Sequence, residues 1–143
     1  MNLADANLLL YAYDVASPRH RAARAWLEET LNGREPFAIP WSSVHAFLRI
    51  GTHPSVFANP MSIQEAVETV ESWLALPAVH VPEPGPRYWQ ILRDLLLAGQ
   101  ARGNLVGDAH LAALAIENGA TLCTTDRDFA RFPGVRVVDP TAA

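Results

Sequence analysis

Lysine is absent from this chain of 143 residues, so all 11 of its basic residues are arginines. Without lysine the chain cannot form a phosphate-binding Walker A loop or use Schiff-base chemistry. A phospho-receiver domain would also lack its usual lysine. The only cysteine, Cys123, has no partner for an internal disulfide, which favours a reducing compartment. These absences exclude several common classes of nucleotide-binding and signalling proteins.

Long apolar runs are also missing. No stretch reaches the roughly 18 apolar residues that span a bilayer, and the first residues do not resemble a secretory signal. We therefore expect a cytoplasmic protein without a membrane partner. Hydrophobic residues make up 50% of the chain and charged residues 18%, which is typical of a globular fold and fits a single domain over residues 1–143.

The net charge of −4 argues against simple electrostatic binding to nucleic acid. A bound divalent ion would change that conclusion, because it offsets the charge of the carboxylates around it. The placement of the acidic residues therefore matters more than their number.

Short apolar segments alternate with amphipathic ones along the whole chain. The apolar segments predict five strands, at residues 2–4, 37–40, 79–81, 120–124 and 135–138. The segments between them predict helices that begin near Asn7, Ser17, Trp41, Ser62, Arg87 and Asp108. This alternation predicts an α/β fold with a mostly parallel sheet.

Three aspartates occupy positions where such a sheet places functional sites. Asp5 directly follows the first expected strand, Asp126 follows the fourth, and Asp108 starts a helix. Because sites in open parallel sheets lie beyond the carboxyl ends of the strands, these side chains are expected to converge. Converging carboxylates repel one another, and a hard divalent cation such as Mg²⁺ or Mn²⁺ relieves that repulsion.

Each aspartate also has an ordinary structural interpretation. Asp108 could simply cap its helix, and Asp126 could be a turn residue. Asp5 has few structural reasons to follow a buried strand. The five histidines show no paired spacing and are expected to be structural or surface residues, while Cys123 and the helix tryptophans are expected in the core.

Three segments of the chain resemble the PIN-domain nucleases, and in particular the VapC-type toxins of bacterial toxin–antitoxin pairs. Residues 4–11 (ADANLLLY) are similar to the D-x-N-x-L-[LV]-Y start of the family. Residues 107–115 (GDAHLAALA) are similar to its central D-A-x-L-A-A-x-A helix, and residues 122–129 (LCTTDRDF) to its T-x-D-x-D-F segment. The three occur in the family's order, and the resemblance covers nearly the whole chain.

This resemblance implies a Rossmann-like three-layer α/β/α sandwich and cleavage of RNA that depends on Mg²⁺, with Mn²⁺ as a substitute. It also implies a homodimer and a cognate antitoxin protein. By position, Asp5 and Asp108 would be the principal metal ligands, with Asp126 as the third acidic member. Asp128 would hold a second metal or a water.

Two supporting residues follow from the same resemblance. Asn7 and Thr124 would support the metal ligands by hydrogen bonds. For contacts with the RNA phosphates the best candidate is Arg102, in the loop before Asp108, because the guanidinium group pairs with phosphate oxygens. The arginines at 19, 21 and 24 more simply form a solvated helix face.

One position departs from the family pattern. Where the family usually has a glutamate on the helix after the second strand, this chain has Ala46, with His45 beside it. Helix geometry turns His45 about 100° away from that position. The missing carboxylate leaves open one metal or two, and also a non-catalytic module that binds an antitoxin or RNA without cutting.

A strand-end aspartate is also found in phosphohydrolases of the haloacid dehalogenase type. Those enzymes usually need D-x-D and a lysine, whereas this chain has Asp5-Ala6-Asn7 and no lysine, so the sequence favours them less. The role of the apolar loop at residues 55–58 stays open, because it is either a contact surface or packs down onto the fold.

Overall fold

The structure, a computed structural model, describes residues 1–142. A five-stranded parallel sheet forms its centre, with the strand order β3-β2-β1-β4-β5. The strands are β1 (Asn2–Ala4), β2 (Phe37–Ala38), β3 (Val79–His80), β4 (Thr121–Cys123) and β5 (Arg136–Val138). The predicted parallel α/β sheet is thus confirmed, with strands slightly shorter than expected.

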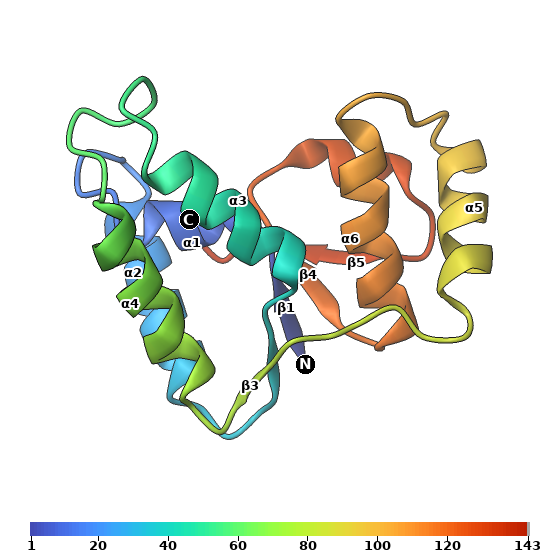
Figure 1. Ribbon diagram of the computed structural model, residues 1–143. Coiled ribbons are helices and arrows are strands. Elements are labelled where there is room, and N and C mark those ends of the chain that lie inside the picture. Colours follow the sequence, from blue (N-terminus) through green and yellow to red (C-terminus); the bar gives the residue numbers. More distant parts are fainter. Residues whose placement is uncertain (143) are drawn as a thin grey trace.

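Helices cover both faces of this sheet. They are α1 (Ala6–Tyr11), α2 (His20–Leu31), α3 (Trp41–Gly51), α4 (Ile63–Leu74), α5 (Tyr88–Ala98) and α6 (Leu105–Glu117), with a short 3-10 helix, η1 (Arg127–Arg131). Figure 1 shows α1 to α4 grouped on one side and α5 with α6 on the other. The three-layer α/β/α arrangement is confirmed.

Alternation along the strands explains the two layers, because successive strand residues face opposite sides of a sheet. Leu3 packs into a cluster with the buried face of α6, whereas its neighbour Ala4 packs with residues of α1 to α4. In β2 the same alternation sends Phe37 to the α1–α4 side and Ala38 to the α6 side. The central strands β1, β2 and β4 are therefore buried on both faces, as their apolar residues require, whereas the edge strand β5 is exposed.

Two helix starts differ from the sequence prediction. Helix α6 begins at Leu105 rather than at Asp108, because a glycine at 107 costs a helix only about 1 kcal/mol and burial of the rest of α6 outweighs it. Helix α2 begins at His20 rather than at Pro18. There Ser17 Oγ accepts a hydrogen bond from the Arg19 backbone N–H, which holds a turn ahead of the helix.

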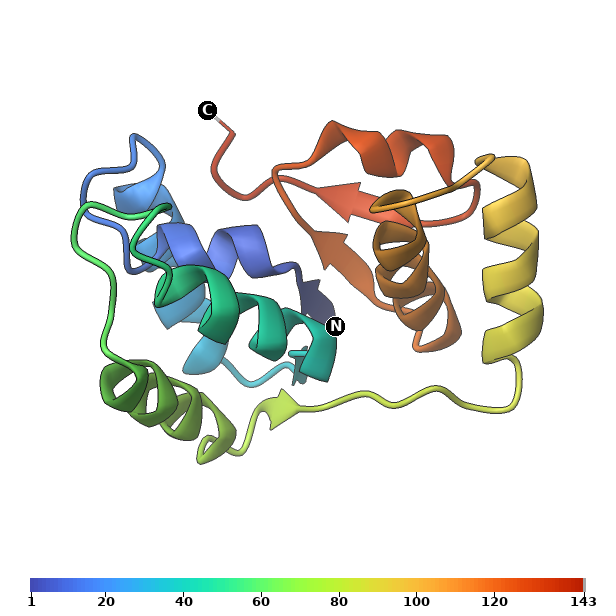
Figure 2. The same ribbon diagram turned by 45° about the horizontal axis from the view of Figure 1, so that its top comes forward.

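The segment between β3 and α5 connects the two helical layers. Figure 2 shows it as an extended stretch that runs from the α4 side to α5. It contains three prolines, at 82, 84 and 86, which favour extended backbone and restrict its motion. Within residues 1–142, no helix has the length and apolar character needed to cross a membrane.

Candidate active site

The strand order reverses between β1 and β4, which lie side by side at the centre of the sheet. Ligand sites of open α/β sheets form beyond the carboxyl ends of the strands at such a reversal. Asp5 is the first residue after β1, and Asp126 follows β4 by three residues. The sequence-predicted candidates therefore flank the expected position of a site.

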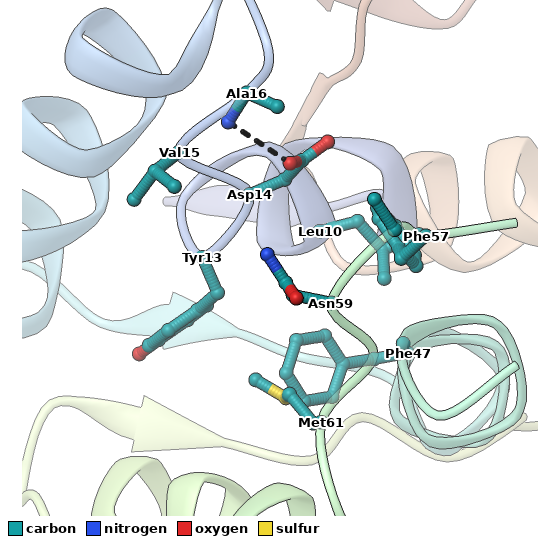
Figure 3. Close-up of a pocket in the computed structure, with 11 residues that line it drawn as sticks. Leu10, Tyr13, Asp14, Val15, Ala16, Phe47, Phe57, Asn59 and Met61 are labelled. Atoms are coloured by element: carbon teal, nitrogen blue, oxygen red, sulfur yellow. Dashed lines mark hydrogen bonds between the residues drawn. The ribbon is translucent and has the colours of Figure 1, made fainter. Parts of the chain in front are cut away.

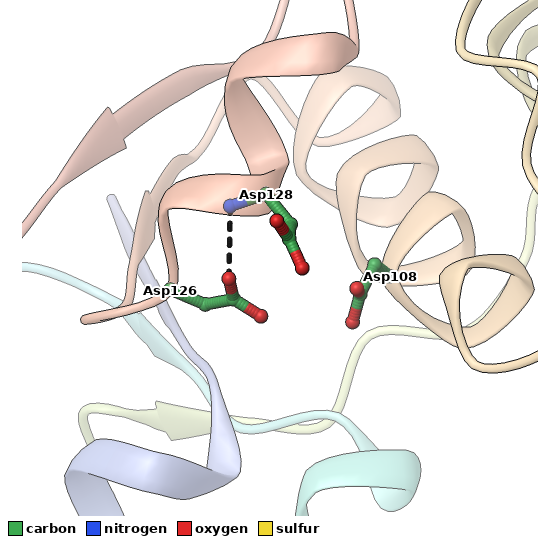
Figure 4. Close-up of side chains that lie close together, drawn as sticks. All are labelled: Asp108, Asp126 and Asp128. Carbon is green, nitrogen blue, oxygen red and sulfur yellow. Dashed lines mark hydrogen bonds between the residues drawn. The ribbon is translucent and has the colours of Figure 1, made fainter.

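Three carboxylates meet at this point. One oxygen from each of Asp108, Asp126 and Asp128 lies within 4.8 Å of the other two. Figure 4 shows Asp108 reaching out from α6 toward Asp126 and Asp128, which come from the turn into η1. Two of the three residues were expected as ligands, and the third, Asp128, was expected as a supporting residue.

The ordinary interpretation of Asp108 does not hold. The residue that precedes α6 as its N-cap is Asn104, and Asp108 lies further on, in the first turn. Asp126, by contrast, has a structural role, because its Oδ1 accepts a hydrogen bond of 2.8 Å from the Asp128 N–H and caps η1. Its second oxygen points toward Asp108 and Asp128 (Figure 4). Asp126 thus serves the turn and the acidic cluster together.

Asp5 has the structural role that the sequence did not indicate. It caps α1, where its Oδ1 accepts a hydrogen bond of 2.7 Å from the Ala6 N–H. Its Oδ2 accepts a hydrogen bond of 2.8 Å from the Thr124 hydroxyl. These bonds fix the orientation of the carboxylate at the edge of the acidic cluster.

Thr124 is the centre of a small hydrogen-bond network. Its Oγ1 donates to Asp5 and accepts from Asn7 Nδ2 at 3.0 Å and from the Asp126 N–H at 3.0 Å. The network joins residues that follow β1 to residues that follow β4. Within residues 1–142, the Asn7 Oδ1 atom is the only buried side-chain oxygen or nitrogen without a hydrogen-bond partner. Such an atom normally indicates a bound water or ion nearby.

The electrostatics of the cluster favour protonation in the absence of a cation. Burial raises the pKa of Asp108 to about 6, and the charges of Asp126, Asp5 and Asp128 contribute to the rise, while Arg131 opposes them. Burial also raises the pKa of Asp5, the bonds from Thr124 and Ala6 lower it, and the charge of Asp126 adds to the rise. The acidic residues therefore repel one another with little compensation from the protein.

This donor set fits a hard divalent cation. All of its ligand atoms are carboxylate oxygens, which Mg²⁺ and Mn²⁺ prefer over nitrogen and sulfur. The raised pKa of Asp108 and the partnerless Asn7 Oδ1 both show a site that lacks a balancing charge or donor. The residues present therefore fit the Mg²⁺ or Mn²⁺ ion that the sequence predicted.

One arginine, Arg131, acts on the acidic cluster. Arg131, which the sequence analysis missed, is near enough to lower the pKa of Asp108, and its guanidinium donates to the Gly99 carbonyl at 3.1 Å. Because it belongs to η1 and its partner to the α5–α6 loop, no sequence pattern links them. Arg102 is exposed in that same loop, and Arg19 and Arg24 are in salt bridges.

Ala46 contributes no charge to the site. It lies three residues after Ser43, whose hydroxyl donates to the Ala4 carbonyl at 2.7 Å. Residues three apart share a helix face, so Ala46 is on the face of α3 that turns toward the residues around Asp5. His45 is exposed on another face.

A separate apolar hollow of about 90 Å³ lies at the far end of α1. Figure 3 shows Leu10, Tyr13, Phe47, Phe57 and Met61 around it. The one acid in its wall, Asp14, accepts a hydrogen bond from the Ala16 N–H. Phe57 of the loop at 55–58 thus packs down, whereas Val56 stays 57% exposed.

Comparison with known proteins identifies the family to which this fold belongs. The family model described as PIN domain matches residues 3–135, and the chain belongs to the PIN-domain family. Ribonuclease VapC37 of Mycobacterium tuberculosis is 39% identical over 142 residues, which is 99% of each chain. Ribonuclease VapC31 of the same species is 41% identical over 144 residues, covering 98% of this chain and 99% of the relative.

Solved structures show the same fold at lower identity. The VapC20 toxin of Mycobacterium tuberculosis, described as cleaving the sarcin-ricin loop, aligns with a TM-score of 0.68 at 15% identity, covering 95% of this chain and 99% of that one. FitAB bound to a DNA fragment aligns with a TM-score of 0.69 at 18% identity, covering 100% and 97%. The family resemblance predicted from the three motifs is confirmed.

Proposed function

We propose that this chain is a metal-dependent endoribonuclease and the toxin of a toxin–antitoxin pair. The observation that carries the proposal is the group of three carboxylates at the reversal point of the sheet. Supporting it are the curated relatives, about 40% identical over nearly the full length, that are named as ribonucleases.

The acidic cluster is where we place the metal. Asp108 and Asp126 are the proposed ligands, with Asp5 beside them and Asp128 as the most exposed member of the group. A bound Mg²⁺ or Mn²⁺ supplies a Lewis acid that lowers the pKa of an attacking water and offsets the charge of the phosphate.

The protein's own residues orient the reactants. Thr124 and Asn7 hold Asp5 and the backbone of Asp126 in one network, so the acidic oxygens keep their relative positions. One oxygen of Asp128 faces the cluster, and we assign it the role of orienting the attacking water and accepting its proton. Arg102, exposed six residues before Asp108, is proposed to hold a flanking phosphate.

The absence of the usual glutamate bears on how many metal ions the site holds. With Ala46 on the α3 face near Asp5, the carboxylates come from the end of β1, α6 and the turn into η1 only. We therefore propose one tightly held metal rather than two. The non-catalytic alternative, in which the chain binds RNA or an antitoxin without cutting, rests on the same missing carboxylate.

An antitoxin and a second copy of the chain are the proposed protein partners. Several solved structures of the fold are toxin–antitoxin complexes, including one from Klebsiella pneumoniae that covers 98% of this chain with a TM-score of 0.64 at 19% identity. The apolar hollow lined by Tyr13, Phe47 and Met61 offers buried apolar area to such a partner.

Cleavage of RNA tests the proposal directly. The purified, antitoxin-free chain is incubated with total bacterial RNA and either Mg²⁺ or Mn²⁺, with EDTA in parallel. Asp108→Asn is compared with Asp94→Asn, which makes the same change on the exposed surface of α5. We expect discrete cleavage products from the wild type and from Asp94→Asn. The cleavage rate should fall by about a hundredfold or more in Asp108→Asn and in the presence of EDTA. Intact RNA with every folded protein would favour the non-catalytic alternative.

A further inference from the structure

A second hollow, of about 260 Å³, has no role in the mechanism above, and it shares helix α6 with the acidic residue Asp108. Its walls are residues 40–42 at the start of α3, residues 82–84 of the extended segment, and His110 with Leu114 of α6. Three of these residues are prolines, which makes the shape of the hollow rigid.

The hollow lies on the same edge of the sheet as the aspartates. Pro40 and Pro82 follow the carboxyl ends of β2 and β3 by two residues each, and Asp5 and Asp126 follow the carboxyl ends of β1 and β4 by one and three residues. Because β2 pairs with β1, and neighbouring strands are about 5 Å apart, the hollow begins one strand away from Asp5. His110 is two residues after Asp108 on α6 and leaves the helix on a different face. The shared edge of the sheet is therefore what places the hollow on the path of an RNA strand that leaves the acidic cluster toward β2.

Trp41 is the main aromatic surface of this hollow. It is the first residue of α3 and is 44% exposed, whereas Trp73 of α4 is only 1% exposed. Two residues on, Ser43 is bonded to the carbonyl of Ala4, next to Asp5. The start of α3 is therefore held in a fixed position relative to Asp5. Exposed aromatic side chains beside a nucleic-acid path are the usual stacking surface for an unpaired base.

His110 brings a directed polar group to the same hollow. Its Nδ1 shares a short hydrogen bond with the Tyr88 hydroxyl, which fixes the ring. Its Nε2 has no partner within residues 1–142 and is not among the buried atoms. The side chain of Ser42 adds a hydroxyl to the wall. These groups can hydrogen-bond the edge of a base that stacks on Trp41.

The charge of Glu83 indicates that the hollow binds a base rather than a phosphate. Its exposed carboxylate is part of the wall, and no arginine is, so an anionic phosphate would be repelled. A carboxylate instead accepts a hydrogen bond from an exocyclic amino group, as it does from cytosine N4. Adenine, cytosine and guanine carry such a group, and uracil does not.

We propose that the hollow between Trp41, Glu83 and His110 binds an unpaired nucleobase with an exocyclic amino group, from the nucleotide next to the cleaved phosphate. Trp41 stacks on the base, and Glu83 with His110 selects its edge. This inference rests on the proposed function, because it assigns a specificity subsite to the same RNA.

Binding of short single-stranded RNA tests the subsite without any need for cleavage. Fluorescently labelled oligocytidine and oligouridine of equal length are titrated by anisotropy in the presence of Ca²⁺, which carboxylates also bind, against the wild type, Trp41→Ala, Trp41→Phe and Glu83→Gln. Trp89→Ala is the matched control, because Trp89 is 63% exposed on α5 and does not line the hollow.

We expect Trp41→Ala to weaken oligocytidine binding about tenfold, Trp41→Phe to restore most of it, and Trp89→Ala to leave it within about twofold. The wild type should prefer oligocytidine to oligouridine about fivefold, and Glu83→Gln should remove most of that preference. Equal effects of Trp41→Ala and Trp89→Ala, equal affinity for both RNAs, or no binding would overturn the inference. If the chain cleaves RNA but does not show these binding differences, the subsite is rejected and the nuclease proposal stands. If it shows these binding differences but does not cleave RNA, the nuclease proposal is rejected and the subsite stands.

Discussion

Thr124 donates a hydrogen bond of 2.8 Å to Asp5, which lies 119 positions earlier in the chain. The bond crosses the reversal point of the sheet, from the end of β4 to the residue after β1. Through the same oxygen, Thr124 also accepts from Asn7 and from the Asp126 N–H. One buried hydroxyl thus sets the relative positions of two acidic residues that follow different strands.

Replacing Thr124 by valine removes these three bonds while keeping the shape of the side chain. We expect Thr124→Val to weaken Mn²⁺ binding and RNA cleavage by about 10- to 100-fold, because Asp5 loses its donor. The free energy of unfolding should fall by about 1 to 3 kcal/mol, since the Asp126 N–H and Asn7 lose a buried partner. Thr124→Ser retains the hydroxyl and is the control. Equal activity of the valine and serine variants would show that the network has no role in positioning Asp5.

The raised pKa of Asp108 predicts how metal binding depends on pH. Because that pKa is about 6, protons compete with the metal for this carboxylate below pH 6 and do so little above pH 7. The dissociation constant for Mn²⁺ should therefore rise by up to about tenfold per pH unit below 6. Calorimetric titrations between pH 5 and pH 7.5 measure it. A constant affinity over this range would contradict a ligand role for Asp108.

Without metal, Asp108 should destabilise the fold at neutral pH. Its folded pKa of about 6 lies above the ordinary value of 3.8, so between these values the folded chain holds a proton that the unfolded chain has released. The free energy of unfolding consequently falls as pH rises from about 4 to 6 and stays low above that. In EDTA at pH 7.5, Asp108→Asn should unfold about 2 to 4 °C higher than the wild type.

That gain corresponds to about 1 kcal/mol, a discounted value because Asp108 is only half-buried and water screens its neighbours. The difference should shrink toward pH 4, where the wild-type carboxyl is protonated in the folded state. Asp94→Asn is the control for a general effect of removing a charge. A lower unfolding temperature for Asp108→Asn at pH 7.5 would contradict the raised pKa.

The fold was largely predictable because its signals are local. Five short apolar segments alternate with helical ones, and this pattern predicts a parallel sheet with aspartates at the strand ends. The prediction of a helix start at Asp108 was wrong because Gly107 resembles a loop residue, although a single glycine does not prevent a helix that buries the alanine-rich face of α6.

Contacts between distant segments could not be predicted. Nothing in the sequence shows that the charge of Arg131 acts on Asp108, and nothing shows that Asp5 caps α1 while it also accepts a hydrogen bond from Thr124. The helix tryptophans were all expected in the core. The structure buries Trp73 but leaves Trp41 and Trp89 exposed, because they lie at the first residues of α3 and α5, beyond the apolar stripe of each helix.

Position 46 allows the metal site to be tested by adding a carboxylate instead of removing one. We expect Ala46→Glu to place a further carboxylate near Asp5 and to tighten Mn²⁺ binding by about tenfold, while it lowers the stability of the metal-free protein through added repulsion. His45→Glu, on the exposed face of α3, is the control and should change neither quantity. Equal Mn²⁺ binding by Ala46→Glu and His45→Glu would show that position 46 does not face the site.

The most direct test of the metal assignment is a crystal of the wild-type chain soaked in Mn²⁺ and measured for anomalous scattering. We expect a peak coordinated by carboxylate oxygens of Asp108 and Asp126, and no such peak in Asp108→Asn. A peak elsewhere on the chain, or a site left empty at saturating Mn²⁺, would contradict the claim that this acidic cluster is a metal centre.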